Sequence, residues 1–454
     1  MRPLAFLALL ALPLAACTPS EQPPPDAGLP FEPGGCGLEP YTWLPAAEVG
    51  DVVEADFHIL SPLAKDDVQQ LVEDNGLSDL GTADYGVEIY TLRYGTQDKG
   101  ERVEATGIVA APFLPADDVQ DFPVVLWLHG TSGFTGACAP SRLGGDNLAV
   151  ALLAAFGFVV VAPDYIGLDA DLPDGELPPV KHAYLGLEQT AVGSLDMVRA
   201  AKALLADVPT GVRPMDDVVL WGGSQGGHAA FACDLLAPYY TPELSVKAMV
   251  ALVPPTDLVG QARYALSGPS PATAALPAAL TALHRWHEGK EPLTDVLTNT
   301  APNNIAEQLP VVMDTTCDFA SIADGIDSVD DVVTQTMLDN VDHIEELSPW
   351  GCYLEKNSIL TSGIPRARAT PTFFQLSADD DLVDPVTERA SFGKLCDAGY
   401  QLHFLECEGA GHTQGALWSF REQMDFVRAI LGQGVYEAIP VCEAQAPVRC
   451  SGTP

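Results

Sequence analysis

The feature that most constrains the fold is the pentapeptide Gly222–Gly226, Gly-Gly-Ser-Gln-Gly, which follows an apolar run at Val218–Trp221 and precedes a run of small residues. The apolar run predicts a buried strand, and the residues after the pentapeptide predict a helix. A turn from strand to helix within one residue strains Ser224 and leaves no room for a Cβ at positions 222 and 226. The pattern matches the G-x-S-x-G turn that presents a nucleophilic serine. It predicts that Ser224 is catalytic; the alternative is a glycine-rich turn whose serine only caps the helix.

Two backbone amides near this serine are candidates for stabilising a developing oxyanion. The N–H of Gln225 stands at the start of the predicted helix, where the helix dipole favours negative charge. A second apolar run, Pro123–Leu128, predicts a central strand and leads into His129–Gly133, His-Gly-Thr-Ser-Gly. The loop after this strand supplies the second donor in α/β hydrolases, so we nominate the N–H of Thr131. The alternative is a plain strand-to-helix loop in which His129 has a structural role.

Strands and helices alternate along most of the chain, which predicts an α/β fold with a mostly parallel central sheet flanked by helices. Two antiparallel strands are expected first, at Val87–Tyr94 and Val103–Ala111, joined by a turn at 97–100. The later strands are expected at Phe158–Ala162, Val218–Trp221, Lys247–Val253, Thr372–Leu376 and Gln401–Leu405, and helices at Asp66–Asn75, Glu188–Ala206 and Leu417–Leu431.

A serine nucleophile needs an imidazole to accept its proton and a carboxylate to orient that imidazole. His412 lies in a glycine-flanked loop after the last predicted strand, and Asp380 lies after the strand before it. The chain order serine, acid, histidine is that of α/β hydrolases. Asp381 is an alternative acid, and the run Asp379–Asp381 could instead be a turn or calcium cluster.

The alternation breaks between about residues 256 and 358, where helical stretches predict a cap or lid inserted into the sheet domain. The core is then divided into 41–255 and 359–454. Within the cap, Ala274–Trp286 forms a helical pattern with a stripe of large apolar residues. Such a stripe either packs the cap onto the domain beneath or lines a site for an apolar substrate; its members are Leu276, Leu280, Leu283 and Trp286.

The first 17 residues predict a targeting segment, with a positive start at Arg2 and a short apolar run at Leu4–Leu14. Small residues before Cys17 resemble a bacterial lipoprotein signal, in which that cysteine becomes the lipidated first residue of the mature chain. Thr18 after it resembles outer-membrane sorting in Gram-negative bacteria, and ordinary secretion is the alternative. Residues 18–40 are rich in Pro, Gly and acid and predict a flexible tether.

The cysteine content and the net charge limit the possible compartments, partners and metal sites of the protein. An exported chain with ten cysteines predicts disulfides. Without Cys17 nine remain; Cys233, on the apolar face of the helix after Ser224, is expected to be a buried free thiol, and the others could form four bridges. The net charge of −40 disfavours nucleic acid as a partner, and no cysteine spacing indicates a metal site. The eight cysteines available for bridges are Cys36, Cys138, Cys317, Cys352, Cys396, Cys407, Cys442 and Cys450.

A likeness to a known family rests on five segments: His129–Gly133, Cys138–Ser141, Ala162–Tyr165, Gly223–Gly227 and Asp380–Val383. Together they resemble the secretory lipase family, the α/β-hydrolase group that includes the fungal lipase A type. The likeness runs from about Tyr85 to His412 and includes the inserted cap. It implies a small-molecule or lipid ester substrate, such as an acylglycerol, an acyl-enzyme route and no cofactor. Ser377 stands where the family usually has Gly. Peptidases, carbohydrate or polyester esterases and non-catalytic binding proteins share this fold.

Overall fold

The computed structural model describes most of the chain, and the predicted targeting segment with Cys17 lies outside the described part. Within that part, we find no helix that combines the length and the hydrophobicity needed to span a bilayer. The described residues are 29–57, 62–74, 76, 81–144, 147–173, 175–300, 304–318, 327–436 and 439–454.

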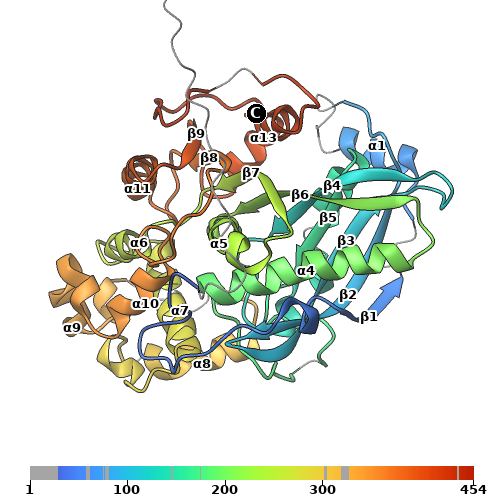
Figure 1. Ribbon diagram of the computed structural model, residues 1–454. Helices are drawn as coiled ribbons and strands as arrows, with labels where there is room; N and C mark the ends of the chain where they lie inside the picture. Colours follow the sequence, from blue (N-terminus) through green and yellow to red (C-terminus); the bar gives the residue numbers. More distant parts are fainter. Residues whose placement is uncertain are drawn as a thin grey trace, which may run out of the picture.

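The described residues form a nine-stranded sheet in the order β1-β2-β3-β5-β4-β6-β7-β8-β9 (Figure 1). The first three strands and the β3–β5 pair are antiparallel, and every pair from β5 through β4 to β9 is parallel. The predicted mostly parallel α/β fold is thereby confirmed. The strands are β1 (Val52–Phe57), β2 (Val87–Asp98), β3 (Glu101–Pro112), β4 (Gln120–Leu128), β5 (Val159–Pro163), β6 (Val212–Gly223), β7 (Ser245–Leu252), β8 (Pro371–Ser377) and β9 (Gln401–Cys407).

Helices cover both faces of the sheet because the central strands are apolar on both sides. In β6, Val218 and Leu220 belong to the core that includes α4 (Leu187–Asp207) and α5 (Gln225–Tyr240). Their neighbours Val219 and Trp221 belong to the core on the opposite face. This alternation follows from the period of two in a strand. The opposite face is covered by α1 (Lys65–Asp74), α3 (Asn147–Ala155) and α13 (Phe420–Ile430), whereas α11 (Pro385–Asp397) lies on the side of α4 and α5.

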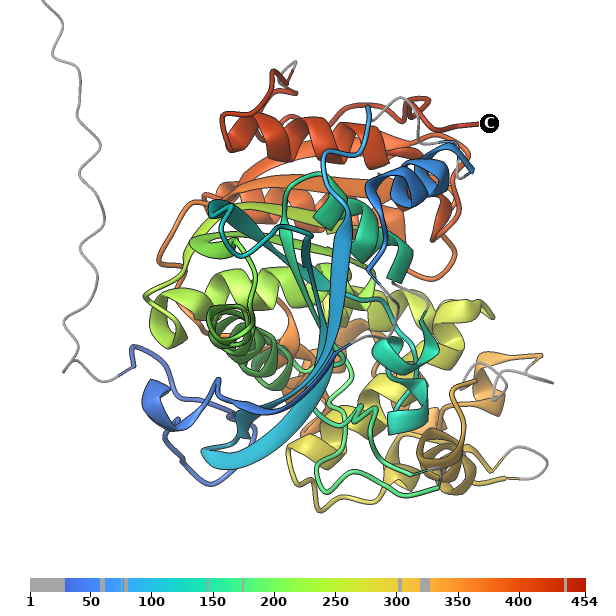
Figure 2. The same ribbon diagram turned by 90° about the vertical axis from the view of Figure 1, so that its right-hand side faces the viewer.

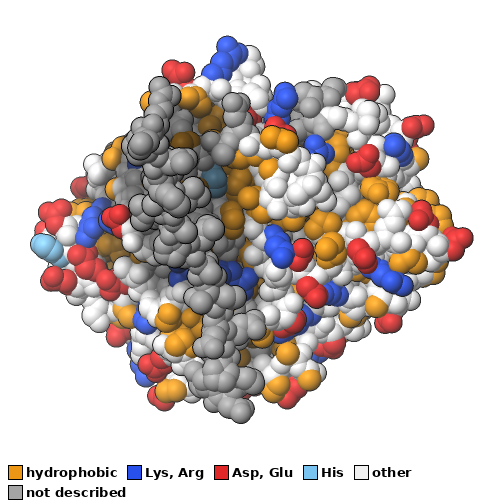
Figure 3. Space-filling model, turned by 45° about the horizontal axis from the view of Figure 1, so that its top comes forward, with side chains coloured by type: hydrophobic (Ala, Val, Ile, Leu, Met, Phe, Trp, Pro, Cys, Tyr) orange, Lys and Arg blue, Asp and Glu red, His pale blue; other side chains and the backbone are white. Residues whose placement is uncertain are grey.

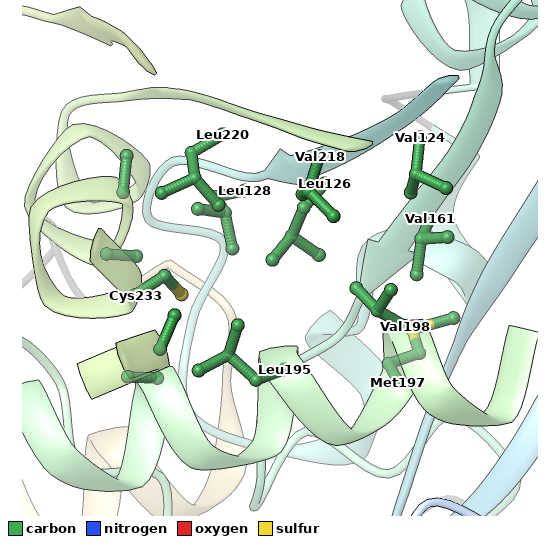
Figure 4. Close-up of a cluster of buried hydrophobic side chains, with 14 of the residues drawn as sticks. Val124, Leu126, Leu128, Val161, Leu195, Met197, Val198, Val218, Leu220 and Cys233 are labelled. Carbon is green, nitrogen blue, oxygen red and sulfur yellow. The ribbon is translucent and has the colours of Figure 1, made fainter. Parts of the chain in front are cut away.

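Figure 4 shows the core between the sheet and α4. Side chains from β4, β5 and β6 point toward the helix, and Cys233 of α5 lies beside them. Cys233 is buried and free, as predicted, and burial raises the pKa of its thiol. The labelled side chains are Val124, Leu126, Leu128, Val161, Leu195, Met197, Val198, Val218, Leu220 and Cys233.

The N-terminal half of the sheet extends beyond the predicted strands. The edge strand β1 was not predicted, because its side chains lack a clear apolar alternation; Val53 and Glu54 are exposed. The β2–β3 hairpin pairs as far as Asp98 and Glu101, so its loop contains only Lys99 and Gly100. Both loop residues have positive φ, 50° and 76°, as a two-residue hairpin turn of this twist requires.

The segment 256–358 gathers at one end of the sheet, as Figure 1 and the side view of Figure 2 show. Its apolar side chains form a separate hydrophobic cluster. The segment leaves and re-enters the core at adjacent points, since the N–H of Ile359 donates to the Thr256 carbonyl at 3.0 Å. Its α-helices are α6 (Leu258–Ala265), α7 (Pro271–Trp286), α8 (Ile305–Thr315), α9 (Gln335–Asp339) and α10 (Trp350–Asn357).

Four disulfides are present among the described cysteines, which confirms the predicted number. Two of them attach the segment 256–358 to other parts of the chain, and two fix the C-terminal tail. The pairs are Cys36–Cys352, Cys138–Cys317, Cys396–Cys442 and Cys407–Cys450.

The prediction of a flexible tether over 18–40 is wrong for the part around Cys36. That cysteine is bonded to Cys352, and the N–H of Gly34 donates to the carboxylate of Glu188 at 2.9 Å. The same carboxylate accepts a hydrogen bond from Tyr41 at 2.8 Å. The Pro- and Gly-rich composition misled the prediction because it carries no information about a partner on α4. The residues of the tether before 29 are outside the described part.

Charged side chains are distributed over the surface without segregation on the face that Figure 3 shows. There, Lys and Arg side chains are scattered among Asp and Glu side chains, with hydrophobic side chains between them. Ion pairs between such residues occur in the described part of the chain, for example Arg93 with Asp169 at 2.9 Å.

Candidate active site

Ser224 stands at the sharp turn between β6 and α5. Its φ and ψ are 57° and −121°, a conformation that L-residues with a Cβ adopt at a cost of about 1–3 kcal/mol. The two flanking glycines permit this turn: a Cβ on Gly226 would meet the carbonyl of Leu128, and one on Gly222 would meet the backbone of Gly226. The strand, turn and helix around Ser224 therefore have the arrangement expected from the sequence.

A hydrogen-bonded chain joins Ser224 to residues from two other loops. The Nε2 of His412 lies 2.8 Å from the Ser224 hydroxyl, and its Nδ1 lies 2.8 Å from Oδ2 of Asp380. His412 follows β9 and Asp380 follows β8, so the parallel strands bring both loops to the edge of the sheet where Ser224 lies. A carboxylate can only accept, so Nδ1 carries the proton and Nε2 is free to accept the serine hydroxyl proton.

The loop after β8 holds Asp380 rigidly. Its Oδ1 accepts hydrogen bonds from the N–H groups of Leu382 and Val383, both at 2.9 Å, and the residue is buried. The neighbouring Asp381 is exposed and takes part through its carbonyl, which accepts from the hydroxyl of Tyr264 at 3.2 Å. The structure therefore brings Asp380, and not Asp381, to His412. Among the described residues, no group of three His, Cys, Asp or Glu side chains is arranged to hold a metal ion.

The loop after β4 lies directly against the serine turn. A Cβ on Gly130 would lie 3.5 Å from the Gly223 carbonyl and 3.9 Å from the Cβ of Ser224. His129 does not point at the serine: its Nδ1 lies 2.6 Å from the Gly130 carbonyl, and its ring stacks on Tyr165 at 4.1 Å. Thr131 follows, with its hydroxyl donating to Tyr184 at 3.2 Å. Both backbone amides nominated from the sequence, those of Thr131 and Gln225, thus belong to segments adjoining Ser224.

His182 is a neighbour of the site that the sequence did not reveal. Its Nδ1 faces the Ile166 carbonyl at 3.3 Å, and its Nε2 accepts from the side-chain amide of Gln225 at 2.8 Å. Burial, the larger cause, and the neighbouring His129 lower the pKa of His182 to about 3, so the His182 ring is neutral. No sequence motif includes His182, because its hydrogen bond with Gln225 forms only in the folded chain.

A mainly apolar cavity of about 60 Å³ opens beside Ser224 between the sheet edge and the segment 256–358. Gln261, Leu382 and Tyr184 also line it, and no sequence signal distinguished them. Many of its lining residues are small residues of α6 and α7. The complete lining is Tyr184, Leu185, Ser224, Gln225, Pro255, Leu258, Gln261, Ala262, Ala265, Ala272, Ala275, Leu276, Ala279, Leu354, Leu382 and Val383.

The lining role predicted for the large apolar stripe of α7 needs correction. Leu276 lines the cavity, but Leu280 and Leu283 are fully buried in the interior of the cap. Trp286 lies at the end of the helix, where its Nε1 donates to Asp98 at 2.8 Å. The large side chains of the stripe fill the interior of the cap. The cavity lies where α7 instead presents alanines, at positions 272, 275 and 279.

Comparisons with known proteins agree with this geometry. A family model described as secretory lipase matches residues 139–429, which is more than half of the chain. A search of curated proteins gave no match. Among solved structures, the rice cell wall degrading esterase LipA from Xanthomonas oryzae superimposes with a TM-score of 0.65 at 19% identity, over 84% of this chain and 97% of that one.

Two further structures have the same fold. A putative hydrolase from Legionella pneumophila has a TM-score of 0.65 at 21% identity, covering 85% of this chain and 100% of the other. Candida antarctica lipase A has a TM-score of 0.63 at 17% identity, covering 89% and 87%. At these identities the structural likeness establishes the α/β-hydrolase fold, and the family match carries the activity.

The disulfides and the family point to the same compartment. Disulfides form and persist in oxidising environments, and four are present here. Together with the secretory lipase match, the disulfides indicate an exported protein. The match also gives the chemistry: the activity is that of a carboxylic ester hydrolase, and the substrate is a small-molecule ester. By the extent of the family match, the chain belongs to the secretory lipase family.

Proposed function

We propose that the chain hydrolyses carboxylic esters of apolar acids, among them acylglycerols, with Ser224, His412 and Asp380 as its catalytic triad. The observation that carries this proposal is the chain of two 2.8 Å hydrogen bonds that ends on a serine in a strained strand-to-helix turn. A serine hydroxyl is a weak nucleophile on its own, and this arrangement provides the base and the orienting acid that it needs.

In the first half of the reaction, Oγ of Ser224 attacks the ester carbonyl carbon while its proton passes to Nε2 of His412. Asp380 stays ionised and stabilises the imidazolium through the Nδ1–H hydrogen bond. The tetrahedral intermediate then breaks its bond to the alkoxy oxygen, which takes the proton from Nε2 and leaves as the alcohol. Water then attacks the acyl carbon of the acyl-enzyme and gives a proton to Nε2 of His412. As the bond to Oγ breaks, Oγ takes this proton back from Nε2, so that Ser224 is regenerated and the carboxylic acid leaves.

The N–H groups of Thr131 and Gln225 donate hydrogen bonds to the oxyanion of each tetrahedral intermediate in this proposal. The hydrogen bond from His129 to the Gly130 carbonyl supports the first assignment. Since C=O and N–H point in opposite directions across a trans peptide, a Gly130 carbonyl held by His129 leaves the Thr131 N–H directed away from that ring. Gln225 opens α5, where the N-terminal end of the helix favours a negative charge.

The acyl group is assigned to the cavity beside Ser224, with the segment 256–358 acting as its cap. The cavity is lined by alanines and leucines of α6 and α7, which take an alkyl chain out of water at about 0.8 kcal/mol per methylene. An apolar acyl chain fits this lining better than an amide or a sugar acid, because few polar groups face the cavity to satisfy them.

Replacing Ser224 by Ala tests the proposal. The variant should retain the wild-type melting temperature and lose hydrolysis of p-nitrophenyl esters, and an organophosphonate should label Ser224 alone in the wild type. Peptide anilides and acetylated sugars, assayed in parallel, should be poor substrates. Wild-type turnover by Ser224→Ala, or faster cleavage of anilides than of esters, would contradict the proposal.

We also propose that the mature protein begins at a lipidated Cys17 and is held at a bacterial membrane. The support is the sequence pattern of small residues before this cysteine. Buried acyl chains would anchor an enzyme whose net charge of −40 is repelled by anionic lipid headgroups. Intact mass spectrometry of membrane-extracted protein should give a diacylated or triacylated N-terminus. A soluble, unlipidated chain that starts elsewhere would overturn this assignment.

A further inference from the structure

Glu388 of α11 is a fully buried carboxylate for which the proposed mechanism has no use. It is 0% exposed, and among the described residues no Lys, Arg or His forms an ion pair with it. A buried carboxylate is costly unless donors converge on it. Here the donors are neutral: the N–H of Thr256, 3.1 Å from both oxygens, the Thr256 hydroxyl at 2.5 Å, and the side-chain amide of Gln261 at 2.9 Å.

The first of these partners marks the base of the cap. Thr256 follows β7 at the point where the segment 256–358 leaves the sheet, and its carbonyl accepts from Ile359, where the segment returns. The next turn is fixed in the same way, because the N–H of Leu258 donates to the hydroxyl of Ser358 at 2.9 Å. Glu388 thus binds the junction that determines how the cap sits on the sheet.

The second partner connects Glu388 to the loop of the triad acid. Gln261 lines the cavity beside Ser224 and uses both ends of its amide: Nε2 donates to Glu388, and Oε1 accepts from the N–H of Asp384 at 2.9 Å. Asp384 directly follows Val383, whose N–H holds Asp380. Two hydrogen bonds and one short turn therefore separate Glu388 from Asp380.

We propose that Glu388 is a positioning residue: through Thr256 and Gln261 it fixes the cap base and the Asp380 loop relative to Ser224. This inference rests on the proposed triad, and it extends the site to a side chain that touches neither substrate nor reacting atoms. The charged carboxylate serves this role better than a neutral group, because all of its partners present donors and hydrogen bonds to a charged acceptor are stronger.

The pKa of Glu388 agrees with a side chain that serves function, because above pH 7 its carboxylate does not stabilise the fold. Burial, the larger cause, and the charge of Asp257 raise the pKa of Glu388 to about 7. A folded-state pKa above the unfolded value of about 4.5 means that this group stabilises the fold below pH 4.5 and that the stabilisation is lost as pH rises through about 7. The charged groups on the surrounding elements are Asp257 at the start of α6, paired with Lys394 of α11, and Arg389 of α11, paired with Glu406 of β9.

Replacing Glu388 by Gln tests the proposal, with Glu188→Gln as the matched control. Glu188 is also a buried carboxylate with a raised pKa and three neutral donors, but these donors lie in the N-terminal segment and not at the cap base or beside the Asp380 loop. For p-nitrophenyl butyrate at pH about 8.5, we expect Glu388→Gln to lower kcat about tenfold with KM nearly unchanged, since a misplacement of about 1 Å can cost about 100-fold and the shift expected here is smaller. Glu188→Gln should keep kcat within about twofold of wild type.

The pH dependence supplies a second readout. The ratio of wild-type to Glu388→Gln kcat cancels every ionisation that the two enzymes share, including that of His412. This ratio should fall toward one as the pH is lowered through about 7, because the protonated wild-type side chain then resembles glutamine. The melting temperature of Glu388→Gln at pH about 8.5 should equal or exceed that of the wild type, because the variant no longer buries a charge.

Two results would overturn the inference: equal kcat losses in the two variants, or a kcat ratio that does not change with pH. If Glu388→Gln does not fold, Thr256→Val removes the hydroxyl donor with little change of shape, and it must then lower kcat at pH about 8.5 with KM retained. Failure here is distinct from failure of the proposed function, since Ser224→Ala would still abolish turnover.

Discussion

Replacing Ala279 by Leu tests whether the acyl chain occupies the cavity beside Ser224. Ala279 lies on α7, is 5% exposed and lines this cavity, whose volume is about 60 Å³. A water-sized group requires about 10–15 Å³ of such volume, so the cavity has room for about four to six methylene groups. Leucine adds three carbons at this position and therefore displaces about three methylenes of the substrate.

The size of the effect follows from the transfer free energy. Three methylenes at about 0.8 kcal/mol each amount to about 2.4 kcal/mol, or about 60-fold in kcat/KM. A series of p-nitrophenyl esters from acetate to decanoate measures it. The loss should appear for acyl chains long enough to reach Ala279, whereas acetate, whose acyl group stays at Ser224, should be hydrolysed at the wild-type rate.

The adjacent residue provides the control. Leu280 is fully buried in the cap interior and does not line the cavity. Leu280→Ala should cost about 2–5 kcal/mol of stability, lower the melting temperature and reduce kcat/KM by a similar factor for every chain length. If Ala279→Leu lowers kcat/KM for acetate and decanoate equally, the acyl chain does not occupy this cavity and the reasoning is refuted.

The remaining predictions concern the acid and the response to pH. Asp380→Asn should lower kcat by roughly 10⁴-fold, the scale found when the orienting acid of a triad is neutralised, whereas Asp381→Asn should have little effect; steady-state assays of both variants decide between the two carboxylates. Burial lowers the pKa of His182 to about 3 and that of His228 to about 4, below the unfolded value of about 6.5, so the contribution of these two residues to the free energy of unfolding should be complete above pH 6.5 and be lost as pH drops toward 4. Urea unfolding at pH 7 and pH 4.5 measures this contribution when the wild type is compared with His228→Gln, which cannot bind the extra proton: between the two pH values the wild type should lose about 2 kcal/mol more than the variant.

The sequence by itself determined the local geometry at Ser224 and the order of the site. The strand, the glycines at positions 222 and 226 and the helix behind the serine are dictated by sterics within a few residues, and the structure has each of them. The loops of Asp380 and His412 could be identified because parallel strands all end at the same edge of the sheet. Which of the neighbouring aspartates faces His412 could not be read from the motif alone.

Errors arose wherever a segment interacts with a distant partner. Composition predicted a free tether around Cys36, but the disulfide to Cys352 spans 316 residues of sequence. The apolar stripe correctly predicted the helix α7, but the prediction that Leu280 and Leu283 line the substrate site was wrong. A helical pattern shows which residues share a face, and it does not show which part of the molecule that face contacts. The large side chains fill the cap interior, and the cavity follows the alanines.

Tertiary structure alone determined the surroundings of the serine. Gln261 and Glu388 are 127 residues apart, and His182 and Gln225 are 43 apart, yet each pair is hydrogen-bonded in the buried part of the site. No local sequence pattern identifies these residues. A buried polar side chain needs a hydrogen-bond partner, and that partner can lie far away in the sequence. Short-range sterics therefore fix the turn that carries Ser224, whereas the need to pair every buried polar group and to fill the interior fixes what surrounds it.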